Sequence, residues 1–488
     1  MSDSQSTEYT TLFIGGSWVE PSTAEVIEVR SPATGAYVGS VPMAAAADVE
    51  AAVAAARTAF DTGPWPWTPP TQRAAVIAAA AKLMADRKEL FTALLVDETG
   101  QPPGIIETMQ WGGAISAMEY FATAVDQVRW TETRIGRYGQ SIVSREPMGV
   151  VGAIVAWNVP LFLAVNKLAP ALLAGCSVVL KPAAETPLTA NALAEVFAEA
   201  GLPDGVLSVV PGGVHTGQAL VASTQLDMLT FTGSTAVGRE IAQRAADMLI
   251  PCTLELGGKS AAIILEDVDL AAAVPMLVFS GVMNAGQGCV NQTRILAPRS
   301  RYEEIVNAIG TFVQALPVGL PSNPAAQVGP LISEKQRARV EGYIAKGLAE
   351  GARLICGGSR PTDLDSGYFL EPTVFADVDN AMTIAQEEIF GPVLSIIAYD
   401  TEEDAIRIAN DSVYGLAGSV WTTNIPHGIE ISQKIRTGTY GINWYAFDPG
   451  SPFGGYKESG IGRENGPEGI EHFTQHKSVL LPMGYRLE

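Results

Sequence analysis

The stretch Val150–Asn158, VVGAIVAWN, is the part of this chain that first indicates its fold. It is almost entirely apolar, as is typical of a strand covered on both faces in a parallel sheet. A helical pattern follows through residues 163–174, and a second apolar run follows in CSVVLKP, residues 176–182. This order of strand, helix and strand predicts a parallel βαβ unit.

The alternation continues along the chain. Helical patterns over residues 188–201, 215–224 and 235–248 alternate with apolar strand patterns over residues 206–213 and 228–234. Strict alternation of strands and helices predicts a doubly wound parallel sheet. A second alternating stretch runs from residue 260 to about residue 451, and it contains SAAIILEDVDL, RLICGG and GPVLSIIAYD as strands. We therefore expect a second α/β domain after the first.

The regions outside these stretches predict simpler elements. Residues 8–40 read as short strands, while residues 48–60 and 71–98 read as helices, the second broken near Asp86 and stopped by Gly100. The tail at residues 476–488 alternates weakly. We expect it to pair as an edge strand with the strand near Ser141 and to form an arm used in assembly.

Composition excludes several classes of function. The 488 residues are too many for one core, so two or three domains are expected. A net charge of -21 argues against binding nucleic acid or anionic lipid. The sequence shows no secretory signal pattern and no apolar run of the roughly 18 residues that span a bilayer. Four dispersed cysteines without CxxC argue against a disulfide framework or a metal site. These observations predict a soluble cytoplasmic α/β protein.

Three motifs combine glycine or lysine with a strand end. FTGSTAVG, residues 231–238, joins a strand to a helix, so Gly233 and Ser234 form either a pyrophosphate site or an ordinary capped turn. Lys181 ends a strand, where ligands of such sheets bind, but it could equally be a surface lysine. GGKS, residues 257–260, lacks the first glycine of a P-loop, because Thr253 stands there.

Two residues are candidates for chemistry from their local sequence. Glu255 lies in an apolar run before two glycines, so it is either a base with a raised pKa or a satisfied structural acid. Cys289, in GQGCVNQTR, is flanked by glycines and polar residues, which slightly favours a nucleophile over a core thiol. Cys176, Cys252 and Cys356 read as structural. The pair His472 and His476 is more typical of a solvated helix end than of a metal site.

A set of motifs in order carries a resemblance to a known family. AWNVP, KPAAETP, FTGSTAVG, LELGGKS, GQGC, EEIFGPV and SPFGGYKESGIGRE together resemble the NAD(P)-dependent aldehyde dehydrogenase superfamily of the hydrolytic type. The resemblance covers residues 12–482. It implies a Rossmann-like coenzyme domain over 1–127 and 148–254, an α/β catalytic domain over 255–455, and a small β oligomerisation arm over 128–147 and 456–488.

The resemblance also implies roles for matched positions. Cys289 would be the nucleophile, Glu255 the general base, Asn158 the donor to the oxyanion, and Lys167 a lysine that supports the site. The coenzyme, NAD with NADP also plausible, would be bound by a set of residues in which Lys181 holds the adenosine ribose, Gly233 and Ser234 the pyrophosphate, and Glu388 and Phe390 the nicotinamide end. The whole predicted coenzyme set is Ile154, Trp157, Lys181, Ala184, Gly217, Gly233, Ser234, Gly238, Leu256, Glu388 and Phe390.

The chemistry implied is oxidation of an aldehyde to a carboxylic acid through a cysteine thiohemiacetal and a thioester, which water then hydrolyses. A coenzyme-A-acylating enzyme would not need the base Glu255. A non-catalytic protein on the same fold would be expected to lack the cysteine, the base or the oxyanion donor. We expect a homodimer or homotetramer.

This sequence departs from the family pattern at several positions. Ala184 stands where many NAD-preferring members carry a glutamate that repels a 2′-phosphate, which predicts measurable use of NADP. Val159 and Asn166 stand where several members carry aromatic residues, which predicts a wide apolar tunnel for aromatic, terpenoid or medium-chain aldehydes. The predicted tunnel set is Val159, Phe162, Asn166, Val290, Phe447 and Phe453, with Leu161 beside it.

Overall fold

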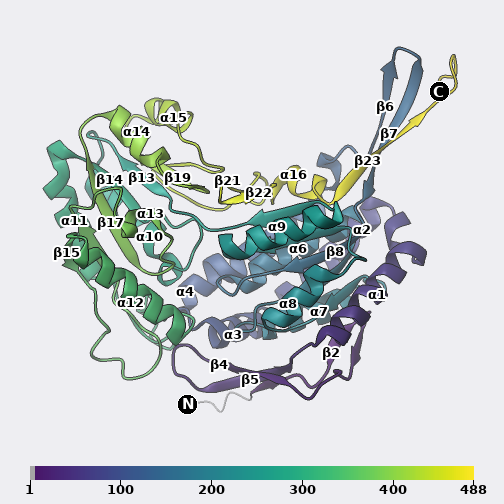
Figure 1. Ribbon diagram of the computed structural model, residues 1–488, viewed down its shortest axis with the longest axis horizontal. Coiled ribbons are helices and arrows are strands. Elements are labelled where there is room, and N and C mark those ends of the chain that lie inside the picture. Colours follow the sequence, from purple (N-terminus) through teal and green to yellow (C-terminus); the bar gives the residue numbers. More distant parts are fainter. Residues whose placement is uncertain (1–5, 488) are drawn as a thin grey trace.

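The computed structural model describes residues 6–487. Figure 1 shows two α/β bodies side by side, with a thin β arm projecting from one of them at the C-terminal end of the chain. The first body contains most of the chain up to residue 255, and the second contains most of the residues from 261 to 442.

The first body is built on an eight-stranded sheet whose central strands are parallel. The apolar stretch at Val150–Ile154 forms one of these central strands, and the predicted alternation is confirmed. The strands run in the order β22 (Gly460–Ile461), β12 (Cys252–Glu255), β11 (Met228–Thr232), β8 (Val150–Ile154), β9 (Ser177–Lys181), β10 (Leu207–Val209), β2 (Leu12–Ile14) and β3 (Ser17–Val19).

Helices cover both faces of this sheet, as its apolar strands require. One face packs against α6 (Pro160–Ala174), α7 (Leu188–Glu199), α2 (Pro70–Asp86), α3 (Lys88–Thr99) and α5 (Gly112–Thr123). The other face packs against α1 (Ala46–Thr62), α8 (Val214–Ala222) and α9 (Thr235–Met248).

Two helix boundaries show how the local sequence acts. The pattern over residues 163–174 predicted a helix that starts too late, because α6 begins at Pro160, whose fixed φ suits the first helical position. The break near Asp86 is confirmed, since α2 ends there and α3 begins at Lys88. Gly100 ends α3 in the left-handed conformation, with φ 67°.

The second body is built on a seven-stranded sheet, parallel except at one edge. Helices α10 (Leu270–Val282) and α11 (Tyr302–Gln314) cover one face, and α12 (Glu334–Ala349), α13 (Thr383–Gln386), α14 (Glu402–Asn410) and α15 (Ile425–Ser432) lie on the other. The strand order is β15 (Arg353–Cys356), β16 (Thr373–Ala376), β17 (Val393–Tyr399), β14 (Arg294–Pro298), β13 (Ala261–Ile264), β19 (Gly418–Trp421) and β20 (Gly441–Ile442).

The arm is a three-stranded antiparallel sheet of β6 (Thr131–Gly136), β7 (Gly139–Pro147) and β23 (Thr474–Leu480) (Figure 1). Leu480 lies opposite Ser141, so the predicted pairing of the tail with the strand near Ser141 is confirmed. β22 belongs to the eight-stranded sheet although it falls within the range predicted for the arm. His472 follows α16 (Gly466–Glu471) and His476 lies in β23, so the interpretation of both as one helix end is wrong.

The remaining elements are short. They are β1 (Thr7–Glu8), β4 (Val26–Arg30) and β5 (Tyr37–Pro42) in one small sheet, β18 (Tyr414–Gly415) with β21 (Tyr456–Lys457), and the helical segments η1 (Trp65–Trp67), α4 (Pro103–Ile105), η2 (Ile106–Trp111), η3 (Ala124–Gln127), η4 (Met283–Gly286) and η5 (Arg299–Arg301). Within residues 6–487, no helix combines the length and the apolar character that crossing a membrane requires.

Candidate active site

The candidate site lies where the two bodies meet. Glu255 is the last residue of β12 in the first sheet, and the loop at 256–260 crosses directly to β13 in the second sheet. The segment 287–293, which carries Cys289, lies between η4 and β14. Since GGKS leads into a strand rather than a helix, the structure also excludes a P-loop at this position.

Cys289 lies in a small apolar cluster between the bodies, partly buried beside Met283, Val290, Leu416 and Phe453. Burial raises the pKa of its thiol strongly, and the nearby carboxylates of Glu255 and Glu388 raise that pKa further. The surroundings therefore favour the neutral thiol, and forming a nucleophilic thiolate requires added positive charge or a base.

A strained turn holds the cysteine loop against Asn158. Asn284 and Ala285 both have positive φ, at 56° and 54°, a conformation that is unfavourable for residues other than glycine. The Asn284 side chain donates to the backbone oxygens of Asn158 and Gln287, at 2.9 and 3.2 Å. The Asn158 side chain donates to the same Gln287 oxygen at 3.1 Å. One N–H of the Asn158 amide is used in this way, and the amide carries a second N–H that can donate.

Glu255 is 4% exposed, and its Oε2 atom has no hydrogen-bond partner within residues 6–487. Burial raises the pKa of this carboxyl well above its usual value, and the charge of Glu464 adds to the effect. Lys167 and Arg463 oppose it. A buried carboxyl with a raised pKa and a free oxygen can take up a proton, as a general base must.

Lys167 is linked to this carboxyl through Glu464, an acid to which the sequence interpretation assigned no role. The Nζ atom of Lys167 donates to Glu464 at 2.5 Å and to the hydroxyl of Thr230 at 3.2 Å. Lys167 is 1% exposed, so both members of the pair are withdrawn from water. Glu464 is the last residue of the motif SPFGGYKESGIGRE, but nothing in the motif links it to Lys167.

A cleft of about 610 Å³ lies at the carboxyl edge of the first sheet. Ser234 caps α9 by accepting the N–H of Val237 at 3.4 Å, so the start of that helix opens into the cleft. A Cβ atom at Gly238 would lie 2.4 Å from the Leu256 side chain, which explains the glycine in this close packing. The cleft lining includes seven predicted coenzyme residues: Ile154, Trp157, Lys181, Ala184, Gly217, Gly233 and Ser234.

Lys181 is buried at the end of β9 rather than exposed on a loop. Its Nζ atom donates to the backbone oxygen of Pro182 at 2.8 Å. Burial lowers the pKa of the amine to about 8, and Glu185 partly offsets this change. The lysine is thus held at the cleft wall with donors left for a polar ligand.

Glu388 and Phe390 belong to the second body, and the charge of Glu388 acts on the Cys289 thiol. The N–H of Gly258 donates to Glu388 at 2.9 Å, and a Cβ atom at Gly257 would lie 2.4 Å from the same carboxylate. Burial raises the pKa of Glu388 to about 7. Phe390 has φ 61°, and its ring packs edge-on against Trp157 with centroids 5.4 Å apart.

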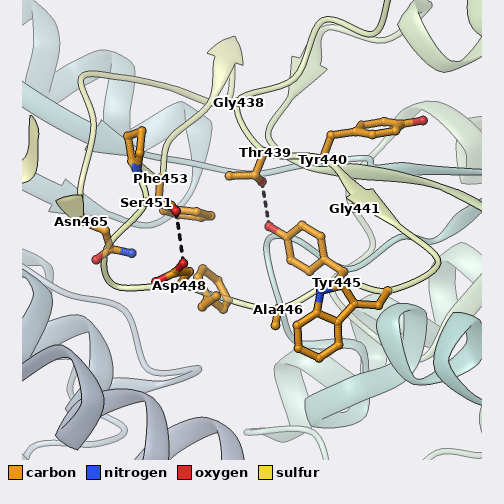
Figure 2. Close-up of a pocket in the computed structure, with 13 residues that line it drawn as sticks. Gly438, Thr439, Tyr440, Gly441, Tyr445, Ala446, Asp448, Ser451, Phe453 and Asn465 are labelled. Carbon is orange, nitrogen blue, oxygen red and sulfur yellow. Dashed lines mark hydrogen bonds between the residues drawn. The ribbon is translucent and has the colours of Figure 1, made fainter. Parts of the chain in front are cut away.

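A cavity of about 310 Å³ adjoins the cysteine cluster, because Phe453 belongs to both, and Figure 2 shows the side chains that line it. Phe447 packs against Phe453 and Phe162, with ring centroids 4.9 and 5.4 Å apart. Phe447 and Phe453 line the cavity, whereas Val159, Asn166 and Val290 are buried outside its lining. The sequence interpretation missed the other eleven lining residues, all supplied by residues 438–465, and the larger or charged side chains among them are Tyr440, Trp444, Tyr445, Asp448 and Asn465.

Comparison with known proteins identifies this arrangement. The model of the aldehyde dehydrogenase family matches residues 18–479. The chain belongs to the aldehyde dehydrogenase family. The predicted fold class is confirmed as well, because structures of this family have a Rossmann-like coenzyme domain, a catalytic domain and an oligomerisation arm.

Individual relatives match along nearly their whole length. Geranial dehydrogenase of Castellaniella defragrans is 46% identical over 471 residues, which are 96% of this chain and 98% of the relative. A Mycobacterium tuberculosis aldehyde dehydrogenase complexed with NAD+ is 80% identical, with a TM-score of 0.99 over 99% of this chain and 100% of the other. A mutant of aldehyde dehydrogenase C from Pseudomonas syringae, complexed with NAD+ and octanal, is 39% identical, with a TM-score of 0.93 over 96% of each chain.

The cleft has features that fit NAD, the coenzyme bound in the Mycobacterium tuberculosis and Pseudomonas syringae structures. The N-terminus of α9 suits an anionic pyrophosphate, because its backbone N–H groups are not used within the helix. Lys181 adds a donor at the cleft wall. In contrast, Arg294 cannot hold a substrate carboxylate, because its guanidinium donates to the backbone of Lys259, Ile408 and Ala409 and to Asn380.

Proposed function

We propose that this aldehyde dehydrogenase converts an aldehyde to a free carboxylic acid by the hydrolytic route. The observation that carries the proposal is the buried carboxyl of Glu255, with one unpartnered oxygen and a raised pKa, close enough to Cys289 to raise the pKa of its thiol. A base in this position is needed only if water attacks the thioester.

In this mechanism the thiolate of Cys289 adds to the aldehyde carbon, and the aldehyde oxygen becomes an anion. The free N–H of Asn158 and the backbone N–H of Cys289 stabilise that oxygen, and one such donor is worth about 3–4 kcal/mol in comparable sites. NAD supplies the hydride acceptor when it is bound. Loss of the hydride leaves a thioester on Cys289, Glu255 removes a proton from water, and the resulting hydroxide releases the acid and restores the thiolate.

Analysis of the product distinguishes hydrolysis of the thioester from transfer of the acyl group to coenzyme A. With NAD and octanal, the expected product is octanoic acid in a one-to-one ratio with NADH, whether or not coenzyme A is present. Formation of octanoyl-coenzyme A at the expense of the acid would overturn the proposal. Cys289→Ala serves as the control and should remove all NADH formation.

We further propose that the substrates are apolar aldehydes of aromatic, terpenoid or medium-chain type. Aromatic rings line the cavity beyond Cys289, and Arg294 is fully occupied by backbone and amide oxygens. A relative named geranial dehydrogenase and a similar structure complexed with octanal support this class. We expect kcat/KM for octanal and benzaldehyde to exceed that for acetaldehyde and for succinic semialdehyde. A preference for either of the last two would contradict it.

A finer proposal concerns the coenzyme. Ala184 lines the cleft beside Lys181, so no carboxylate stands at this position to repel a 2′-phosphate, although Glu185 lines the same cleft. We expect measurable turnover with NADP, with KM above that for NAD by less than a thousandfold. A larger ratio would contradict the proposal, and Ala184→Glu should raise the ratio by disfavouring NADP alone.

We also propose that two or four copies assemble through the β arm in the cytoplasm, with the domain limits given above except that β22 belongs to the first sheet. Ile135 and Leu480 on the arm are 85% and 82% exposed, which is unusual for large apolar side chains. All four cysteines are free. Light scattering after size exclusion should give a dimer or tetramer, and a concentration-independent monomer would contradict assembly.

A further inference from the structure

Gln287, two residues before Cys289, links the cysteine loop to the residue proposed as the oxyanion donor. Its backbone oxygen accepts one N–H of the Asn158 amide at 3.1 Å, and it accepts the Asn284 amide at 3.2 Å. The two N–H groups of a side-chain amide lie in one plane, so fixing one of them also fixes the direction of the other. The position of this carbonyl oxygen therefore decides where Asn158 can donate.

The side chain of Gln287 holds that carbonyl in place. It is 2% exposed, and its polar atoms bond to the backbone of the second body. Its Oε1 atom accepts the N–H of Ile332 at 2.9 Å, and its Nε2 atom donates to the backbone oxygens of Asn284 and Pro330 at 3.1 and 3.3 Å. Turning the side chain would leave these buried groups unpaired, which is costly, so Gln287 is held in one conformation.

The segment that Gln287 contacts also touches the first body. The Pro330 oxygen accepts a second hydrogen bond, from the Nε2 atom of Gln101 at 2.9 Å, and Gln101 follows α3 of the first body. A Cβ atom at Gly329 would lie 2.9 Å from the Gln101 side chain, so the two segments are in close contact. Gln287 thus lies between two contacts of the bodies, one through Pro330 and one through Asn158.

The chain on both sides of Gln287 has little room to compensate for a change of its side chain. A Cβ atom at Gly286 would lie 2.1 Å from the backbone of Gly391, and one at Gly288 would lie 2.4 Å from the Asn291 side chain. Gly286 also has φ 73°, a conformation that favours glycine. Because the loop is closely packed on both sides, a shift of the Gln287 carbonyl must disturb the whole cysteine loop.

We propose that Gln287 is a positioning residue for the oxyanion: its side chain fixes the carbonyl that orients the Asn158 amide toward the aldehyde oxygen. Oxyanion donors act when they are aimed at the place where the charge develops, so turning the amide away removes much of its effect. The inference rests on the proposed role of Asn158 as the oxyanion donor.

The test is kcat/KM for aldehyde oxidation, followed as NADH formation, in Gln287→Met. We expect a loss of roughly ten- to a hundredfold, since misplacing a group that acts on the reacting atoms has effects of this size. The loss should be the same with octanal and with acetaldehyde, because both present the same carbonyl group. The dissociation constant for NAD, measured by fluorescence quenching, should stay unchanged, because Gln287 is not among the residues that line the coenzyme cleft.

The matched control is Gln101→Met. Gln101 is 1% exposed and donates to the same Pro330 oxygen, but within residues 6–487 its side chain donates otherwise only to the backbone oxygen of Thr99. Both variants remove a buried amide, so a merely structural role predicts similar losses of activity in the two. A positioning role predicts a loss in Gln287→Met and almost none in Gln101→Met. Equal losses would overturn the inference.

Gln287→Glu is a second variant, of the same length, that serves if Gln287→Met does not fold. It keeps an oxygen that can accept the N–H of Ile332, but it replaces the donor by an oxygen that faces two carbonyl oxygens. Normal NAD binding shows that the variant is folded, and its kcat/KM should fall as in Gln287→Met. An unaltered kcat/KM in a variant that binds NAD normally would overturn the inference.

Asn158→Ala distinguishes the two levels of the argument. It should lower kcat/KM by about 10²–10³-fold through loss of the donor. Adding Gln287→Met to it should have no further effect, because the group that Gln287 orients is gone. If Asn158→Ala leaves kcat/KM unchanged, the proposed role of Asn158 fails, and the inference fails with it. If Asn158→Ala lowers kcat/KM but the effect of Gln287→Met is the same with and without Asn158, the role of Gln287 alone fails.

Discussion

Lys167 on α6 and Lys259 in the loop between the two sheets are both buried, and their surroundings differ. Lys167 forms a direct ion pair with Glu464 at 2.5 Å and donates to Thr230. The Nζ atom of Lys259 has no hydrogen-bond partner within residues 6–487. We therefore expect the stability of the fold to depend on the pair of Lys167 with Glu464, whereas the charge of Lys259 can be removed with little loss of stability.

The largest expected effect comes from breaking the direct pair. Lys167→Met leaves Glu464 buried without its cation, which should lower the free energy of unfolding by about 3–5 kcal/mol. Lys259→Met replaces an unpaired buried cation by an apolar side chain, which should be neutral or stabilising. Urea unfolding of the two variants measures the contrast, and equal losses in both would contradict it.

The double variant Lys167→Met with Glu464→Gln sharpens this result. Replacing Glu464 removes the charge that the single variant leaves unpaired, so part of the lost stability should return. No recovery would mean that Lys167 stabilises the fold through packing rather than through the pair.

A second prediction concerns pH and the base. The carboxyl of Glu255 has a raised pKa, so it is protonated at low pH and can accept a proton from water only as the pH rises through that pKa. Where hydrolysis limits the rate, kcat should therefore increase with pH. Glu464→Gln removes a neighbouring negative charge and should move the rise in kcat to lower pH by about one unit. An unchanged or upward-shifted profile of kcat against pH would contradict this.

The smallest expected effect concerns the thiol. Both Glu255 and Glu388 raise the pKa of Cys289, and Glu255 has the larger effect. In protein without NAD at pH 8, we expect alkylation by iodoacetamide to be several-fold faster in Glu255→Gln, with a smaller increase in Glu388→Gln. Lys335→Met, which changes an exposed lysine, is the control and should alkylate at the rate of the unaltered protein. A larger increase in Glu388→Gln than in Glu255→Gln would show that Glu388, and not Glu255, has the larger effect on the pKa of the Cys289 thiol.

Much of the fold could be predicted because the local pattern of apolar and polar residues indicates its strands and helices. The apolar run at 150–154 and the helices that follow it appear as expected, and the tail pairs with the strand near Ser141. The start of α6 and the placement of His476 were mispredicted. Both depend on details, a proline at the first helical position and the strand at 474–480, that periodicity alone does not resolve.

Residues of the site could be predicted only where they belong to a recognisable sequence motif. Glu464 pairs with Lys167 across 297 positions of sequence, so only the folded chain brings them together. The left-handed turn at Asn284 could not be predicted, because the residue in this conformation is not a glycine. Lys259 was dismissed with the failed P-loop, and its isolation became visible only once its burial was known.

The most direct test of the central claim is the fate of the acyl group when Glu255 cannot act as a base. Glu255→Gln, mixed with NAD and octanal, should release about one NADH per active site and then nearly stop, since loss of a general base slows a step by about 10²–10⁴-fold. Intact-mass analysis should then show an octanoyl group on the protein, absent when Cys289→Ala is added. Continued turnover at the unaltered rate without an adduct, or an adduct that persists in Cys289→Ala, would contradict the account.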